Sequence, residues 1–367
     1  MKIFKFLSQI LIQAWHGLFH QTKDNIDFAR FPPIETKENS TLKRYKIKIR
    51  RFLSWCFNVV YFLCHAKKFF KSCQLLCDQV SKELFINNIL YKLLGKNHIQ
   101  IKEKNNWVSE KILLDTANQF YSAPSNFSHR KHPEFGELNH YKSIPTERGN
   151  INLDCWLNNV MCIALKKQYY FSRNNINIKP ELGDIVIDGG GCFGDTSVFF
   201  AKSVGATGKV YVFDPLPIHG AVIQKNISQN NLESCITYLP YAISESSNNT
   251  KYNENLIHAI DPGFRILDES SFPIISIDEF VQQYKVSKIN FIKMDIEGHE
   301  LLALKGAIQT IKKFMPKLAI SIYHRREDFH AIPLWLNKIT DGYQYYIDHY
   351  TIHAEETVLY AIAKQDI

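Results

Sequence analysis

The hydrophobic pattern of the chain changes character near residue 184. From there onward, short runs rich in Val, Ile, Phe and Tyr alternate with segments long enough to form helices. We predict strands at residues 184–188, 209–214, 236–242, 274–277, 290–295, 317–323, 343–349 and 357–363. We predict helices between them at residues 194–204, 218–230, 277–284, 299–312 and 326–339. Strands that alternate with helices indicate a parallel sheet with helices on both faces.

The last two predicted strands have to pair differently from the others. Only residues 350–356 separate them, whereas a parallel crossover needs a dozen residues or more. These two strands therefore form an antiparallel hairpin. The predicted fold class is α/β: a doubly wound, mostly parallel seven-stranded sheet with a C-terminal antiparallel hairpin and a helical N-terminal extension.

The first half of the chain shows helical periodicity instead. Apolar residues near 3.6-residue spacing predict an amphipathic N-terminal helix, and they are Ile3, Leu7, Ile10, Leu11, Ala14 and Leu18. We also predict helices at 109–120, with Ser109 as its cap, and at 153–173, joined through a loop at 129–140. These patterns divide the chain into a basic helical region (1–105), a helical transition or lid region (106–180) and an α/β domain (181–367).

Charge is distributed unevenly between the two halves. Residues 1–150 hold 24 Lys and Arg against 12 Asp and Glu, whereas residues 151–367 hold 20 against 24. Six basic residues between 43 and 51 precede an apolar run at 52–64, which is shorter than the roughly 20 residues needed to cross a bilayer. Residues 41–71 can form a packed helix with a solvated basic face, or contact an anionic membrane surface. No recognition motif or stacking platform supports nucleic-acid binding, so we expect none.

The strongest local signal is a glycine-rich turn between a strand and a helix. The segment 188–194 reads Asp-Gly-Gly-Gly-Cys-Phe-Gly and satisfies two cofactor-binding patterns. From Gly189 it matches the dinucleotide fingerprint of NAD-dependent oxidoreductases. From Asp188 it matches the turn that binds S-adenosylmethionine in Rossmann-like methyltransferases. Asp214, at the next strand end, suits ribose hydroxyls in both cases.

Two features favour the methyltransferase interpretation. The carboxylate of Asp188 at the strand tip suits a ligand ammonium group and would repel a pyrophosphate. The C-terminal hairpin also matches the added strand of the class I methyltransferase sheet. The NAD-dependent oxidoreductase remains the alternative at this point.

Further motifs resemble those of the FkbM-type methyltransferase family. They are Ser-Ile-Asp-Glu-Phe at 276–280, Lys-Met-Asp-Ile-Glu-Gly-His-Glu at 293–300, the strand ending in Tyr323-His324, and Glu-Thr-Val-Leu-Tyr-Ala at 356–361. The resemblance covers roughly residues 145–363. It implies S-adenosylmethionine as cofactor, and methylation of a hydroxyl on a sugar or another small molecule.

Carried onto this chain, the resemblance assigns the cofactor site. Asp188, Gly190, Gly191 and Gly194 would surround the amino-acid end of the cofactor, and Asp214 would bind its ribose. Tyr241 and Ala242 would border the adenine. Tyr241 departs from the acidic residue that many class I enzymes place there, so Glu245 or backbone groups would have to take that role.

The acceptor side is expected beyond the carboxyl ends of the central strands. Asp295, Glu297 and His324 fall there, and one of them would act as the base for an alcohol acceptor. Asp295 and Glu297 lack a clear third ligand, so we expect no metal ion.

The remaining expectations concern partners and location. The eight cysteines form no CxxC pair, which suits a reducing compartment, and we expect a cytoplasmic protein with a small-molecule or saccharide acceptor and peripheral membrane contact through residues 41–71. A further alternative is a catalytically inactive methyltransferase-fold module that docks on a membrane.

Overall fold

The computed structural model describes residues 3–19, 41–95, 98–99, 101, 110–127, 136–246 and 272–367. Within residues 41–52 it describes the backbone but not the side chains. The predicted cap at Ser109 and most of the predicted loop at 129–140 lie outside the described residues.

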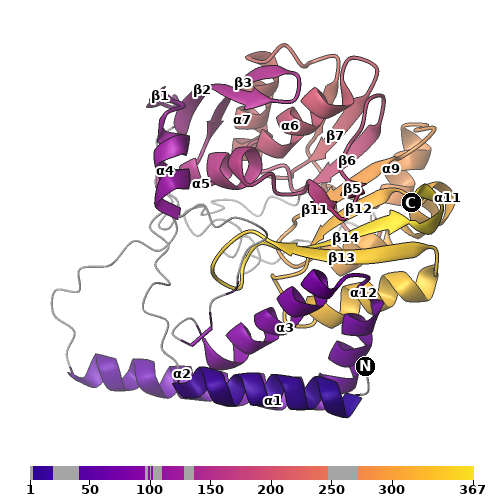
Figure 1. Cartoon of the computed structure of the whole chain (residues 1–367). Helices are drawn as coiled ribbons and strands as arrows, with labels where there is room; N and C mark the ends of the chain where they lie inside the picture. The colour runs from indigo at the N-terminus through magenta and orange to yellow at the C-terminus, as the bar shows by residue number, and fades with distance from the viewer. Residues whose placement is uncertain are drawn as a thin grey trace.

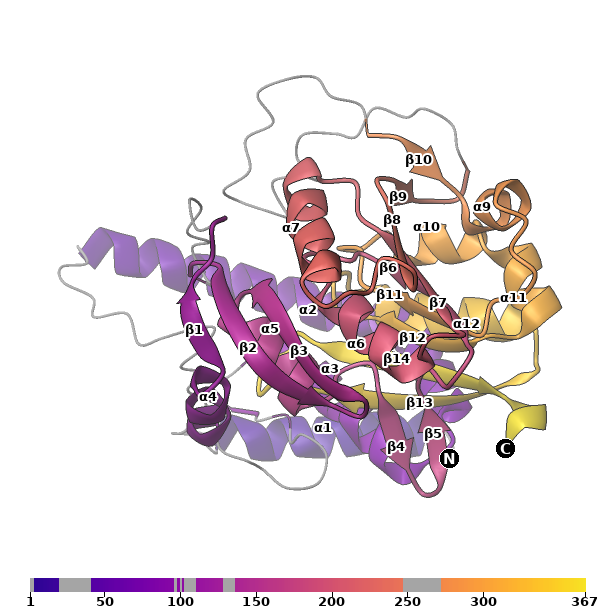
Figure 2. The ribbon, with the colours of Figure 1, turned by 90° about the horizontal axis from the view of Figure 1, so that it is seen from above.

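A seven-stranded sheet forms the centre of the molecule (Figures 1 and 2). Its strands, in spatial order, are β13 (Tyr343–His349), β14 (Thr357–Ala363), β12 (Lys317–Ser321), β11 (Phe291–Met294), β6 (Ile185–Gly189), β7 (Lys209–Phe213) and β8 (Ile236–Leu239). The five strands from β12 to β8 are parallel. β14 runs antiparallel to both β12 and β13. The predicted α/β fold class and its C-terminal hairpin are confirmed.

One predicted strand is shorter than expected. The run 236–242 stays in the central sheet only to Leu239, where β8 ends at Pro240. A proline has no backbone N–H to donate to a neighbouring strand, so the ladder stops there. The chain continues as β9 (Ala242–Ile243), which pairs in parallel with β10 (Ile274–Ile275) in a separate small sheet.

Helices cover both faces of the central sheet (Figure 1). α6 (Asp195–Val204) and α7 (Pro217–Ser228) share one apolar core with one face of the sheet. The opposite core includes α9 (Ile277–Gln283), α10 (Glu300–Lys305), α11 (Ile308–Phe314) and α12 (Asp328–Ile339).

The single helix predicted at 299–312 is two helices, α10 and α11, which meet at Gly306. A Cβ atom at Gly306 would lie 2.2 Å from the carbonyl oxygen of Ser244. The close approach of these two backbones therefore requires glycine at the break.

The N-terminal region is helical, as predicted, and packs on the sheet side that carries α12. It consists of α1 (Ile3–Phe19), α2 (Thr41–Leu75) and α3 (Gln79–Leu94). Phe6, Phe69 and Phe85 lie in the same apolar core as Tyr345 of β13 and Phe329 of α12. Among the described helices, none combines the length and apolar character that a membrane crossing requires.

The segment before the sheet corrects one prediction. The helix expected at 109–120 is α4 (Glu110–Asn118), but most of 153–173 is not a regular α-helix. It contains the end of β3 (Gly149–Cys155), the short α5 (Leu157–Asn159), a π-helical turn, η1 (Val160–Leu165), and β4 (Phe171–Arg173). In β3 the residues Ile151, Leu153 and Cys155 are buried at a period of two, the pattern of a strand.

Three further strands and one short helix complete the described elements. β1 (Tyr121–Pro124) and β2 (Asn139–Thr146) form an antiparallel sheet with β3, and β5 (Ile176–Ile178) pairs with β4. The 3-10 turn η2 (Lys364–Asp366) follows β14.

A buried arginine links the three regions of the chain. The Arg173 guanidinium on β4 donates to both carboxylate oxygens of Asp78 at 3.0 Å and to the carbonyl oxygen of Ile347 at 3.1 Å. It also forms an ion pair with Asp348 at 3.2 Å. Asp78 is the N-cap of α3, where its side chain accepts a hydrogen bond from the Ser81 N–H. One side chain thus holds α3, β4 and β13 together.

We therefore predict that Arg173→Ala lowers the free energy of unfolding by about 3–5 kcal/mol, because it leaves buried carboxylates without their cation. Urea unfolding followed by circular dichroism measures the change. Lys179→Ala is the matched control, since Lys179 pairs with the exposed carboxylate of Glu147 and should cost at most about 1 kcal/mol. Equal losses in both variants would contradict the linking role of Arg173.

Candidate functional site

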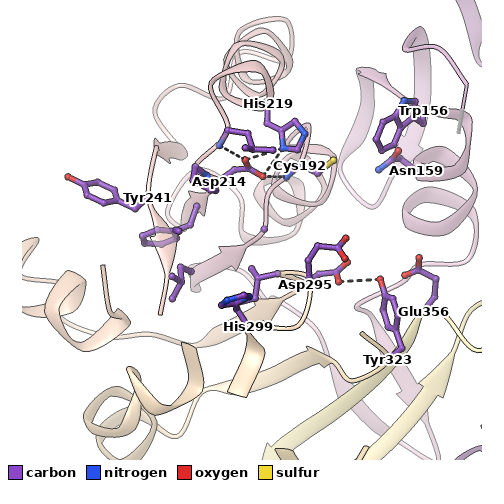
Figure 3. A pocket seen from close by; sticks show the side chains of 18 of the residues that line it. Trp156, Asn159, Cys192, Asp214, His219, Tyr241, Asp295, His299, Tyr323 and Glu356 are labelled. Carbon is purple, nitrogen blue, oxygen red and sulfur yellow. Dashed lines mark hydrogen bonds and ion pairs between the residues drawn. The ribbon is translucent and has the colours of Figure 1, made fainter. Parts of the chain in front are cut away.

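A cavity opens at the carboxyl ends of β6, β7 and β11, where ligands bind in doubly wound sheets (Figure 3). Among the residues predicted for the site, those that line it are Gly190, Asp214, Tyr241, Ala242, Asp295 and Glu297. The structure thus brings the predicted cofactor side and the predicted acceptor side into one cavity. Asp188, Gly191, Gly194 and His324 do not line the cavity. His324 contacts the lining residue Asp295.

The glycine turn lies unusually close to two neighbouring strands. Gly190 has φ +77°, and a Cβ there would lie 1.8 Å from the carbonyl oxygen of Asp295. A Cβ at Gly191 would lie 2.1 Å from Cγ2 of Val212 on β7. Gly194, at φ +75°, is the N-cap of α6. These positions exclude larger residues for reasons of packing and backbone conformation.

Asp188 does not face the cavity. It is fully buried and forms an ion pair with Lys293 of β11 at 2.9 Å, and its other oxygen accepts hydrogen bonds from the hydroxyls of Thr196 and Ser197. Burial would lower the pKa of Lys293, but the carboxylates of Asp188 and Asp295 outweigh it and raise the pKa. Lys293 also donates to the carbonyl of Gly190 at 2.7 Å. The carboxylate thus binds a lysine ammonium where the sequence predicts a ligand ammonium.

Asp214 lies at the end of β7 with its carboxylate held in one orientation. Its oxygens accept hydrogen bonds from the backbone N–H of Cys192 at 2.9 Å and of Leu216 at 3.0 Å. The ring Nδ1 of His219 lies 3.0 and 3.1 Å from the two oxygens. His219 also lines the cavity (Figure 3). The fixed carboxylate leaves lone pairs for a ligand without having to reorganise.

Beside Asp214 the cavity wall is apolar. It is formed by Phe213, Leu216, Tyr241, Ala242 and Ile243. Glu245 does not line the cavity; its exposed side chain lies 3.9 Å from Lys305. A flat apolar ligand such as a purine would therefore meet side-chain carbons and backbone groups here rather than a carboxylate.

The opposite wall carries carboxylates in two different states. Asp295 accepts hydrogen bonds from the hydroxyls of Tyr169 at 2.7 Å and Tyr323 at 3.3 Å. Burial acts to raise its pKa, but His324 and Lys293 outweigh burial and lower it, so Asp295 is ionised at neutral pH. Glu297 lies at the cavity mouth with φ +55°. Partial desolvation and the nearby carboxylates raise the pKa of Glu297 to about 7.

His324 lies among three carboxylates. Its Nδ1 contacts the buried Glu300 at 2.9 Å, and its Nε2 lies 3.3 Å from Asp295 and 3.4 Å from Glu297. Burial opposes the charged form, but these carboxylates outweigh it and raise the pKa of His324 to about 10. Asp295, Glu300 and His324 also lie close enough to share a metal ion. The protonated ring of His324 places a positive charge among these carboxylates without a metal ion.

Comparison with known proteins agrees with this geometry. Residues 188–345 match the model of the methyltransferase FkbM domain. Residues 188–345, fewer than half of the chain, are therefore similar to this domain, and we refer to them as the FkbM domain. This confirms the family that the sequence motifs indicate.

Two known proteins extend the comparison. The chain is 31% identical over 105 residues to the hexuronic acid methyltransferase AglP of Haloferax volcanii, covering 28% of this chain and 43% of that protein. The crystal structure of methyltransferase FkbM from Methylobacillus flagellatus superposes with a TM-score of 0.52 at 19% identity, covering 82% of this chain and 60% of that one. The chain thus spans less than two thirds of either relative, and the structural likeness supports the fold.

Several lining residues were not predicted, and they come from outside the FkbM domain, from its loops and from the start of α7. Trp156 and Asn159 belong to the segment expected to be one helix, so no signal distinguished them. Asn159 donates to Asp195 at 2.9 Å, while its side-chain oxygen is buried without a hydrogen-bond partner. Tyr323 and Glu356 lie within the motifs quoted above, which could have identified them. His219 follows Asp214 by five residues, in the first turns of α7.

The raised pKa of His324 predicts a pH dependence of stability in the FkbM domain. A histidine with a folded-state pKa of about 10 stabilises the fold fully below its ordinary pKa of 6.5, and this contribution is lost as pH rises toward 10. The wild type should therefore lose stability relative to His324→Gln by up to about 1.4 kcal/mol per pH unit in this range. Urea unfolding between pH 6.5 and 10 measures the difference.

His330→Gln is the control for this experiment. The pKa of His330 is lowered to about 4 by burial, so that histidine is neutral throughout the range. The free energy of unfolding of His330→Gln should change with pH in the same way as that of the wild type. A His324→Gln variant that also follows the wild-type slope would show that His324 is neutral.

Proposed function

We propose that this chain is an S-adenosylmethionine-dependent methyltransferase that acts on a hydroxyl group. The observation that carries the proposal is that one cavity joins Gly190 and Asp214 to the acidic wall of Asp295 and Glu297. The match of residues 188–345 to the FkbM methyltransferase domain supports it.

The cavity residues suit this cofactor in shape and charge. Asp214 would accept the ribose hydroxyls, and the apolar wall beside Tyr241 and Ala242 would border the adenine. The side-chain oxygen of Asn159, which has no hydrogen-bond partner within the chain, would accept a hydrogen bond from the ammonium group of the cofactor. The carboxylates of Asp295 and Glu356 favour a cationic sulfonium and disfavour the pyrophosphate of NAD.

When bound, S-adenosylmethionine supplies a methyl group activated by a positively charged sulfur. Held by Asp214 and the apolar wall beside Tyr241 and Ala242, the cofactor would supply the methyl carbon to the acceptor oxygen, and its sulfur would keep the electron pair of the carbon–sulfur bond. The chain has to align the acceptor hydroxyl and take its proton. Glu297, with a pKa near 7 at the cavity mouth, suits the role of base. Asp295, held by Tyr169 and Tyr323, would orient the hydroxyl, and His324 would balance the negative charge.

The acceptor we propose is a saccharide or another small hydroxylated metabolite. The hexuronic acid methyltransferase relative supports a sugar, and the acidic wall would accept hydrogen bonds from sugar hydroxyls. We propose a cytoplasmic enzyme that does not act on nucleic acid and that reaches a membrane surface through residues 41–71. The alternative of a catalytically inactive module is decided by whether the purified chain transfers methyl groups.

We predict that Asp214→Asn weakens the binding of S-adenosylhomocysteine by about 10- to 100-fold, because a charged acceptor of the ribose hydroxyls is lost. Isothermal titration calorimetry measures the affinity, and circular dichroism checks that the fold is kept. Glu245→Gln, an exposed site outside the cavity, should bind as the wild type does. Unchanged affinity in Asp214→Asn would show that the ribose lies elsewhere.

We predict that Asp295→Asn lowers turnover by about 100-fold or more while affinity for S-adenosylhomocysteine changes only a few-fold. The loss follows from removing the ionised acceptor that orients the hydroxyl. A screen of hexuronic acids and other hydroxylated acceptors with methyl-labelled S-adenosylmethionine supplies the assay. Glu181→Gln is the control, because Glu181 is exposed, pairs with Lys317 and does not line the cavity. Full activity of Asp295→Asn would remove it from the catalytic residues.

A further inference from the structure

α1 and α2 carry large apolar side chains on their solvent faces. In α1 the most exposed are Phe4 (82%), Trp15 (64%), Leu11 (63%) and Ile12 (57%). In α2 they include Leu53, Phe57, Val60 and Leu63, each between 57% and 60% exposed. Contiguous exposed apolar side chains of this size mark an interaction surface in a folded protein.

The exposed side chains of α2 form a stripe rather than a scatter. Leu53, Phe57 and Val60 recur at spacings of four and three, so they share one side of the helix. Lys67 and Lys71 continue the same side over the next turns, and both are exposed. The opposite side is the one that packs on the protein, with Phe62, Phe69 and Cys73 buried. The stripe is thus an additional apolar face, which meets the packed side only at Phe57, where the Arg326 guanidinium lies 4.5 Å from the centre of the ring.

Charge on the same two helices has a single sign. α1 and α2 together contain ten Lys and Arg residues and no Asp or Glu. Six of these basic residues fall in the first eleven residues of α2. An apolar stripe flanked by basic residues alone is complementary to an apolar layer covered by negative charge.

We propose that the exposed faces of α1 and α2 form one docking surface for an anionic lipid bilayer, with both helices lying in the plane of the membrane. α1 contacts α2, and in Figure 1 both helices run along the lower edge of the molecule, on the opposite side of the sheet from α6 and α7. The surface extends the contact predicted for residues 41–71 by adding α1. It deepens the proposed location and is independent of methyl transfer.

Other occupants fit the surface less well. A second copy of the chain would bring two sets of ten positive charges together, which disfavours association. Nucleic acid would attract the charges, but its phosphates offer nothing to the exposed Leu, Ile and Val side chains. A bilayer with anionic headgroups accommodates both the charges and the apolar stripe.

The test is flotation of the full-length chain with phosphatidylcholine vesicles, with and without phosphatidylglycerol. We expect binding to the anionic vesicles, weak or no binding to the neutral ones, and weaker binding at high salt. The variants V60E/L63E and L11E/I12E should lose binding because each buries charge in the apolar layer. K67Q/K68Q/K71Q should bind about 100-fold more weakly, as expected for removing three surface lysines at about 1 kcal/mol each.

L182E is the matched control, because Leu182 is 64% exposed and lies outside α1 and α2. It should bind vesicles as the wild type does. Unchanged thermal unfolding and S-adenosylhomocysteine affinity in all variants show that the fold is kept and separate this test from that of the cofactor site. The proposal is overturned if the chain does not bind anionic vesicles, if it binds nucleic acid instead, or if every variant binds the vesicles as well as the wild type does.

Discussion

The site depends on a buried ion pair between two central strands. Asp188 is the penultimate residue of β6 and Lys293 lies in β11, and neither side chain is more than 2% exposed. Removing two charges from water is costly, so such a pair persists only when further hydrogen bonds satisfy it. Here the hydroxyls of Thr196 and Ser197 bind the carboxylate, and the carbonyl of Gly190 accepts from the ammonium. The pair thereby ties the glycine turn to β11, the strand that leads into Asp295.

Much of the fold could be predicted because the signal was local. The hairpin at 343–349 and 357–363 has the predicted bounds, since both strands are rich in β-branched, aromatic and other apolar residues and the connection is short. The predicted bounds are wrong where contacts between distant segments determine the secondary structure. Gly306 breaks a helix because the backbone at Ser244 lies against it, and no periodicity shows that. The segment 153–173 has helix-compatible spacing, yet the burial of Leu153 and Cys155 beside α7 makes its start a strand.

The residues of the candidate site also fall into those that the sequence predicts and those that depend on distant contacts. Asp214 and Asp295 could be predicted because each directly follows a strand whose end was visible in the sequence. Asp188 has the same sequence signal, but its partner Lys293 is a hundred residues away, and the pairing turns its carboxylate from the cavity. Protonation states were beyond prediction for a related reason. Burial raises the pKa of Glu297, and the carboxylates of Glu300, Asp295 and Glu297 raise that of His324, and both depend on segments that meet only in the folded chain.

The uneven charge of the sequence corresponds to two separate regions of the structure, one basic and one acidic. The net positive charge of the first 150 residues is concentrated on α1 and α2, whereas the cavity is lined by Asp214, Asp295, Glu297 and Glu356. A cationic methyl donor would be attracted to the acidic cavity and repelled by the basic helices α1 and α2. An anionic membrane would be attracted to the helices and repelled by the cavity. In the arrangement we propose, separating the two charge regions would let one chain hold a cationic donor and lie on an anionic surface at once. A chain with the same net charge spread evenly would weaken both interactions.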